Sequence, residues 1–157
     1  MSATRREVLF LLSGLVSSAV ELEGLPNQGS SNQGSPNQDN SLPSTTYAFS
    51  ELPVKTANGA EIRPVLKGKL ATAESLEVHE TTLPPGGMPH PAHHHVHSEM
   101  WLIREGTVQL TINGTSHVMG PGAVGFVHSN DEHGIKNVGT TPATYFVVAV
   151  GPGADAQ

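Results

Sequence analysis

The sequence contains no cysteine, few basic residues and no long apolar run. The absence of cysteine excludes disulfides and thiolate ligands, so any metal must be held by nitrogen and oxygen atoms. Only 8 residues are Lys or Arg, and the formal net charge is −6, which argues against nucleic acid or an anionic membrane surface as a partner. The apolar stretch from Val8 to Val20 is shorter than the about 20 residues of a membrane-spanning helix, so stable membrane insertion is not expected.

Glycine and proline are frequent, with 17 and 12 residues, and they favour many short strands joined by turns over long helices. Strands are expected near residues 76–78, 100–104, 107–112, 116–119, 123–127, 133–137 and 144–150. Segment 100–104 is almost continuously apolar, which favours a strand covered on both faces. Asn113-Gly114 is typical of a two-residue hairpin turn. This pattern predicts an all-β sandwich or barrel with one core.

The N-terminus has the features of an export signal. The sequence TRREVL, residues 4–9, resembles the bacterial twin-arginine motif, and a short apolar region follows it. Small residues at Ser17 and Ala19 predict cleavage after Ala19. Residues 1–19 are therefore expected to be a signal peptide, and the mature protein is expected to be periplasmic or secreted.

The next segment, residues 20–46, is expected to be a disordered linker. Its three imperfect pentapeptides PNQGS, SNQGS and PNQDN contain no apolar residue, so they cannot bury enough surface to offset the entropy of ordering. The folded domain is then expected to occupy residues 47–157.

A cluster of histidines precedes the strand expected at residues 100–104. Side chains at i and i+2 of a strand point to the same side, so a strand conformation would let His93 and His95 present two imidazoles to one ion. Glu99 supplies a third ligand. A fourth is expected from among the downstream histidines His117, His128 and His133, and we choose His133.

The spacing Gly87-x5-His93-x-His95-x3-Glu99-x6-Gly106 resembles the first signature motif of the cupin superfamily at every defined position. The second cupin motif is partly matched by the sequence from Gly122 to Asn137, in which His128 replaces the usual proline and Asn130 the usual glycine. The resemblance implies a small single-domain cupin, a double-stranded β-helix or jelly-roll barrel with its metal in the mouth between the sheets. The ligands that it implies are His93, His95, Glu99 and His133. The side chains expected to supply pocket walls are Trp101, Ile103, Phe126 and Phe146.

The other histidines are given lesser roles. Strand parity turns His94 away from the metal, and His90 sits between prolines. His97 shares parity with His95 but is expected in a turn, where it could act as a hydrogen-bond donor or proton carrier beside the ligands. The histidines at positions 79, 117 and 128 are expected to be surface or packed residues.

Three imidazoles and one carboxylate leave open positions on an octahedral ion, so an oxygen-rich small molecule could bind there. Dioxygenase-like chemistry is favoured. The alternatives are non-redox Lewis-acid chemistry by an isomerase, decarboxylase or lyase, with Glu99, the candidate catalytic residue, or His97 moving protons, and a non-catalytic binding module. Mn or Fe is the favoured metal, because folding before export avoids competition from Cu and Zn, although Zn, Cu and Ni remain alternatives. The resemblance also implies a homodimer.

Overall fold

The computed structural model describes residues 41–156, which contain nine β-strands and two short 3-10 helices. The strands are β1 (Lys55–Ala57), β2 (Ala60–Lys69), β3 (Ser75–Leu83), β4 (Ser98–Glu105), β5 (Val108–Ile112), β6 (Thr115–Met119), β7 (Val124–Val127), β8 (His133–Asn137) and β9 (Ala143–Val150). The short helices are η1 (Phe49–Glu51) and η2 (Ala154–Ala156). The prediction of an all-β domain is confirmed. The predicted signal peptide, residues 1–19, and residues 20–40 of the predicted linker lie outside the described residues.

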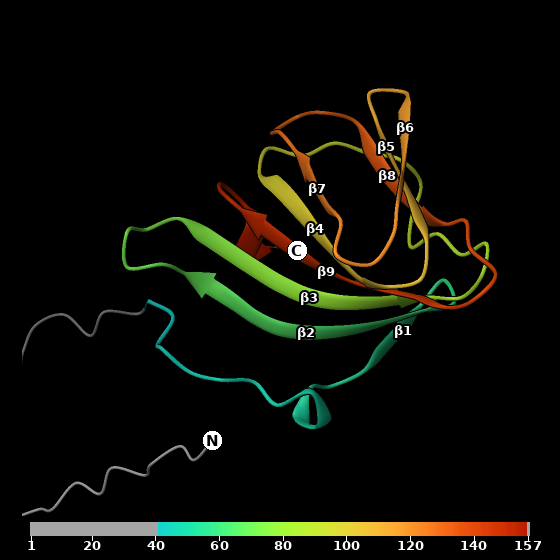
Figure 1. Ribbon diagram of the computed structural model, residues 1–157. Helices are drawn as coiled ribbons and strands as arrows, with labels where there is room; N and C mark the ends of the chain where they lie inside the picture. Colours follow the sequence, from blue (N-terminus) through green and yellow to red (C-terminus); the bar gives the residue numbers. More distant parts are fainter. Residues whose placement is uncertain (1–40, 157) are drawn as a thin grey trace, which may run out of the picture. The chain divides into compact units, whose positions relative to one another are not determined.

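The strands form two antiparallel sheets, as Figure 1 shows. The larger sheet has the strand order β1-β2-β3-β9-β4-β7, and the smaller has the order β6-β5-β8. Strands far apart in sequence are therefore neighbours, since β9 lies between β3 and β4. This arrangement fits a jelly-roll β-barrel. No helix within residues 41–156 is long and apolar enough to cross a membrane.

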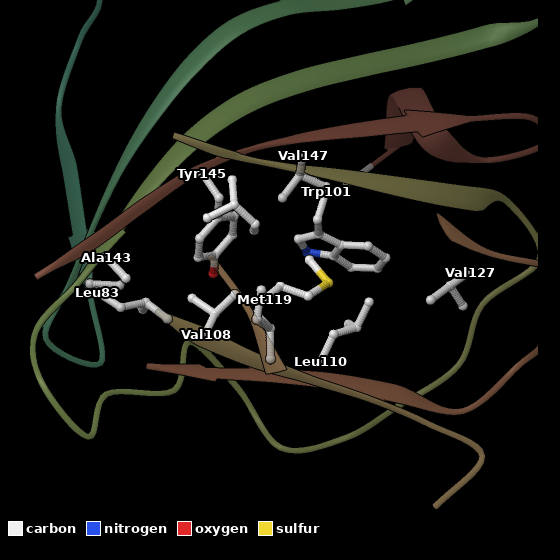
Figure 2. Close-up of a cluster of buried hydrophobic side chains, with 12 residues drawn as sticks. Leu83, Trp101, Val108, Leu110, Met119, Val127, Ala143, Tyr145 and Val147 are labelled. Atoms are coloured by element: carbon white, nitrogen blue, oxygen red, sulfur yellow. The ribbon is translucent and has the colours of Figure 1, made fainter. Parts of the chain in front are cut away.

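The core lies between the two sheets. Figure 2 shows Trp101 of β4 with Tyr145 and Val147 of β9 facing Val108 and Leu110 of β5. All five side chains are buried, and each belongs to the inward-facing half of a strand with period-2 alternation. Their burial supplies the main stabilising force of the domain.

Strand β4 corrects one sequence expectation. Its segment 100–104 is expected to be covered on both faces, but within that segment only Trp101 and Ile103 are buried, while Met100 and Leu102 on the other face are 37% and 38% exposed. The run of apolar residues in this strand therefore reflects an exposed apolar outer face, not burial of both faces. The alternation was hidden because both faces carry apolar side chains.

Two turns explain why asparagine and glycine occur at particular positions of the sequence. Asn113 and Gly114 both have positive φ, 46° and 78°, which confirms the predicted two-residue hairpin between β5 and β6. Gly106, at φ 77°, lies so close to the backbone of Ala143 that a Cβ would meet its Cα at 2.6 Å. Glycine is required there by both conformation and space.

Asn137, the last residue of the second motif, ties the loop before the histidines to the barrel. Its fully buried side-chain amide donates hydrogen bonds to the carbonyl oxygens of Leu83 and Thr141, at 3.0 and 2.8 Å. Its backbone pairs with Gly86 and Gly87, at 3.0 and 2.9 Å. The start of the histidine-bearing loop is therefore fixed to the end of β8.

Residues before the predicted domain start also contact the barrel. Ser41 forms a parallel β-bridge with Lys69, and the backbone N–H of Leu42 donates to the Lys69 carbonyl oxygen at 2.7 Å. The Leu42 side chain packs directly against Gly68 of β2. Contacts with the folded domain therefore begin by residue 41.

Candidate metal centre

The structure places His93 and His95 in the loop between β3 and β4, outside any strand. The expectation that they project from one strand face is therefore wrong. Prolines at positions 89 and 91 leave this segment without regular ladder pairing. The only β-type contact recorded in this described loop is a single bridge between His93 and His133.

The loop is nevertheless held firmly against β8. The N–H of His93 donates to the His133 carbonyl oxygen at 3.0 Å, and the His133 N–H donates back at 2.8 Å. The Asn130 N–H donates to the carbonyl oxygen of His95 at 2.8 Å. These bonds, in place of strand parity, bring the imidazoles together.

Asn130 occupies the position where cupins usually carry glycine. Its φ is 65°, in the left-handed region that asparagine tolerates better than most residues. The departure from the motif therefore preserves the shape of the turn before His133. His128, at the usual proline position, is exposed.

Three imidazoles converge on one point. The ring centroid of His133 lies 4.8 Å from those of both His93 and His95, and the latter two are 5.2 Å apart. One nitrogen from each ring lies within 4.8 Å of the other two. All three rings are at least half-buried.

The nitrogens that face one another have no hydrogen-bond partner among the described residues: Nδ1 of His93, Nε2 of His95 and Nε2 of His133 are buried without one. The opposite nitrogens of two rings are occupied, since Nδ1–H of His95 donates to the His97 carbonyl oxygen and Nδ1–H of His133 to that of Asp131, both at 2.9 Å. This fixes the tautomer that leaves Nε2 with a free lone pair. Buried polar atoms are normally satisfied, so these orphaned nitrogens fit a divalent metal.

Glu99 lies at the start of β4 and points to the same centre. Its Oε1 is 3.1 Å from Nε2 of His95, and its Oε2 is 3.5 Å from Nε2 of His133. Burial disfavours the ionised carboxyl, but the contact with His133 and the positive charge that the imidazoles can carry outweigh it, so the pKa of Glu99 is lowered. The carboxylate is thus available as an oxygen ligand.

His97 is more closely involved than the sequence indicated. It is buried, its ring stacks on that of His95 with centroids 3.5 Å apart, and its Nε2 lies 3.4 Å from Oε1 of Glu99. His95, His97 and Glu99 form a second set that could hold a metal. The shared i, i+2 spacing of these three residues was the signal, and it was discounted because a turn was expected at His97.

The neighbouring imidazoles affect one another's protonation. Burial, with repulsion from His90, His133 and His95, lowers the pKa of His93 to about 4. Burial also opposes the charge on His133, but its contacts with Glu99 and the Asp131 carbonyl prevail, so the pKa of His133 is raised. The His93 ring is therefore neutral at physiological pH and available as a ligand. The His133 ring holds a proton more readily, and a metal must displace that proton to bind.

A cavity of about 180 Å³ adjoins this cluster. Its walls include Trp101 and Tyr145, while Ile103 lies in the core and is not among the lining residues. Phe126 is 55% exposed on the outer sheet face, and Phe146 is on that same face, opposite Leu102. Of the four expected pocket walls, only Trp101 is confirmed.

The remaining histidines differ in whether they line the cavity. His94 is exposed, in agreement with the expectation that it points away, and His117 is exposed as well. His90 is exposed but lines the cavity and meets the His93 ring edge-on at 4.3 Å. His79 on β3 also lines the cavity, a placement that the sequence did not indicate.

A larger groove of about 460 Å³ lies between residues 46–53 and β2. None of the clustered histidines lines it, and it is more open than the cavity beside them. The histidines and Glu99 gather instead around the smaller cavity.

Comparison with known proteins supports the fold. The family described as "Cupin domain" matches residues 79–149. A cupin of the RmlC-like type from Shewanella frigidimarina has 17% identity and a TM-score of 0.59, with 73% of this chain and 97% of that one covered. A predicted oxalate decarboxylase from Thermotoga maritima has 21% identity and a TM-score of 0.58, with 68% and 99% covered. These likenesses show the cupin fold, in agreement with the family match.

A curated relative adds little about activity. Mannose-1-phosphate guanylyltransferase from Klebsiella pneumoniae is 33% identical over 67 residues, 43% of this chain. This chain spans only 14% of that protein's length. The match therefore concerns one small domain of a much longer enzyme.

Proposed function

We propose that His93, His95, Glu99 and His133 hold one divalent metal ion, and that the cavity beside it receives a small oxygen-rich organic molecule. The observation that carries this proposal is the set of three buried ring nitrogens that face one another without a well-aligned hydrogen-bond partner, two of them within 3.5 Å of the Glu99 carboxylate. Mn or Fe is the favoured metal, with Zn, Cu or Ni as alternatives, because the donors are nitrogen and oxygen atoms.

The favoured reaction is dioxygenase-like. A divalent metal with four protein ligands would polarise the oxygen atoms of a chelated substrate and retain room for a further small ligand. The cavity of about 180 Å³ supports a substrate smaller than a drug-sized molecule, for which pockets of about 300–1,000 Å³ are usual. Trp101 and Tyr145 would exclude water on one side, and Glu99 would carry protons.

The test begins with protein purified from its native compartment without an affinity tag or added metal. Elemental analysis should give about one metal ion per chain, and a His133→Ala variant should lose it. Oxygen consumption is then measured with small 1,3-diketones and enediols. Metal without turnover on any substrate would favour the non-catalytic binding module, and absence of metal under all loading conditions would contradict the proposal.

A second reaction class, non-redox proton transfer, has its own supporting observation. His79 lines the same cavity and is hydrogen-bonded to the carboxylate of Glu77 at 2.9 Å. Such a pair suits an isomerase, decarboxylase or lyase, in which a base beside the metal moves a proton. Turnover without oxygen consumption would select this class.

We further propose that residues 1–19 direct export and that the mature protein works in the periplasm or is secreted. The support is the Arg5-Arg6 pair and the apolar stretch behind it. Replacing both arginines with lysine should leave the precursor in the cytoplasm, because recognition of the pair depends on guanidinium groups. Normal processing of that variant would contradict twin-arginine export.

A homodimer is proposed as the assembly. The outer faces of β4 and β7 carry Met100, Leu102, Val124 and Phe126, which are 37–59% exposed. Contiguous exposed apolar surface is typical of interaction sites. β7 is also an edge strand, so a second copy of the chain can approach this apolar surface at the edge of the sheet.

A further inference from the structure

Glu77 and His79 lie on β3, two residues apart and hence on one face of the strand. His79 and Trp101 both pair with Val147 of the intervening β9, whose side chain is buried in the core. Neighbouring strands are about 4.8 Å apart, so the Cα atoms of His79 and Trp101 are separated by about 10 Å. His79 and Trp101 therefore lie on the same sheet with one strand between them, and both line the cavity beside the histidine cluster.

The hydrogen bond between the two residues fixes the state of the His79 ring. Nδ1 lies 2.9 Å from both carboxylate oxygens of Glu77. An ionised carboxylate can only accept, so Nδ1 carries the proton and Nε2 of the neutral ring has a free lone pair. The imidazole side chain is 23% exposed and that of Glu77 13%, so the pair is partly shielded from solvent. A carboxylate in this position stabilises the imidazolium that forms when Nε2 takes a proton.

We propose that Glu77 and His79 form a general acid–base pair that moves a proton on a small, uncharged α-hydroxy carbonyl compound held between β3 and the histidine cluster. The proposal rests on the proposed metal site for one purpose, which is the binding of the two neighbouring oxygen atoms of that compound. The pair itself is separate from the four proposed ligands.

The chemical class follows from the cavity. Its lining residues, as far as the chain is described, include no lysine or arginine, so apart from the proposed metal no permanently charged cation there would balance a phosphate or carboxylate group on the substrate. Two adjacent oxygen atoms suit chelation by one ion. The cavity volume of about 180 Å³ suits a molecule of a few carbon atoms.

The step conserves atoms and electrons. Nε2 of His79 takes the proton from the carbon that bears the hydroxyl group, so that a C–H bond breaks and an N–H bond forms. The C–H electron pair becomes a carbon–carbon π bond, and the carbonyl π pair moves to its oxygen. Return of the proton to the adjacent carbon, with a hydroxyl proton transferred between the oxygens, completes an isomerisation. No oxidant is consumed, and reversal without isomerisation exchanges the carbon-bound hydrogen with solvent.

The proposal is tested with dihydroxyacetone as the probe, in D₂O, with the full-length protein loaded with Mn²⁺ or Zn²⁺. NMR should detect incorporation of deuterium at carbon in the wild type. His79→Asn should slow this exchange by about 100-fold or more, the usual contribution of a positioned acid or base. Metal content, measured on the same samples, should be unchanged. The control is His117→Asn, at an exposed position on β6, which should exchange at the wild-type rate.

Glu77→Gln is the second variant, because it retains an acceptor for Nδ1–H but loses the charge. Its exchange should be slower, because the imidazolium that forms when Nε2 takes the proton loses its carboxylate partner. Independently of any metal, ¹⁵N NMR at pH 8 should show His79 protonated at Nδ1.

The outcomes separate the two proposals. Exchange that is equal in wild type and His79→Asn, or absent from wild type containing one metal per chain, would overturn the acid–base pair and leave the metal site intact. A His79 ring protonated at Nε2 alone would overturn it as well. Failure of the wild type to bind metal would instead contradict the proposed metal site.

Discussion

His93 and His133 are joined by two backbone hydrogen bonds, in which the N–H of each donates to the carbonyl oxygen of the other, at 3.0 and 2.8 Å. This bridge connects the loop before β4 to the first residue of β8. Two residues 40 positions apart thereby set the distance between their imidazoles, whose centroids are 4.8 Å apart. The site is pre-formed by the backbone, so substitutions of the side chains should change metal binding more than folding.

The first prediction is that substitutions of the proposed ligands weaken metal binding. His93→Ala, His95→Ala and His133→Ala should each lower metal affinity by orders of magnitude, because each removes a proposed direct ligand, while Glu99→Gln should have an intermediate effect. Calorimetric titration with Mn²⁺ or Zn²⁺ measures this. His94→Ala, at an exposed neighbouring position, is the matched control and should bind normally. Loss of binding in His94→Ala with retention in His133→Ala would place the metal on the histidine-rich tract alone.

Most of the fold could be predicted from the sequence, because period-2 alternation and turn residues are local signals. The hairpin at Asn113-Gly114 and the strand β8 are examples. The conformation of His93 and His95 could not be predicted in this way, since prolines interrupt the ladder and a distant bridge orients the loop.

The position of His79 illustrates a different limit. Its alternation within β3 is readable, but its place at the cavity beside the histidine cluster depends on β9 lying between β3 and β4. That pairing joins segments remote in sequence, and no local pattern encodes it. The outward placement of Phe126 was missed for a related reason, since an apolar side chain on a strand does not reveal which face is covered.

The second prediction concerns pH. The pKa of His133 is raised above its usual 6.5 because contacts with Glu99 and Asp131 outweigh burial, so a proton competes with the metal even near neutral pH. The pKa of His93, about 4, makes that ring a weak competitor. The apparent Kd should therefore rise by about tenfold per pH unit as pH falls below the raised pKa of His133, with release of one proton on binding in that range. Titration in buffers of different ionisation enthalpy counts the proton, and a Kd constant from pH 8 to pH 5 would contradict this assignment.

The third prediction concerns His97, whose ring stacks on His95 while its Nε2 faces Glu99. His97→Ala removes the stacked ring and should weaken metal binding by about tenfold, the lower range for a residue that supports a ligand. His97→Phe keeps a flat ring against His95 and should lose less. Both variants retain the backbone carbonyl that accepts from Nδ1 of His95. The absorption spectrum of bound Co²⁺ should shift in both, whereas identical spectra and affinities would show that His97 does not position the ligands.

The fourth prediction tests the proposed homodimer through the apolar surface of β4 and β7. Met100 lies directly opposite Phe126, and Leu102 opposite Val124, so the four side chains form one continuous exposed patch. Phe126→Glu would place a charge in the middle of a buried interface, where its desolvation is not compensated, and should convert a dimer to a monomer. Light scattering after size exclusion, at micromolar concentration, gives the mass. Val118→Glu, at a position 68% exposed on β6 and outside the patch, should remain dimeric. A monomeric wild type, or a Phe126→Glu variant that stays dimeric, would exclude this surface as the interface between two copies.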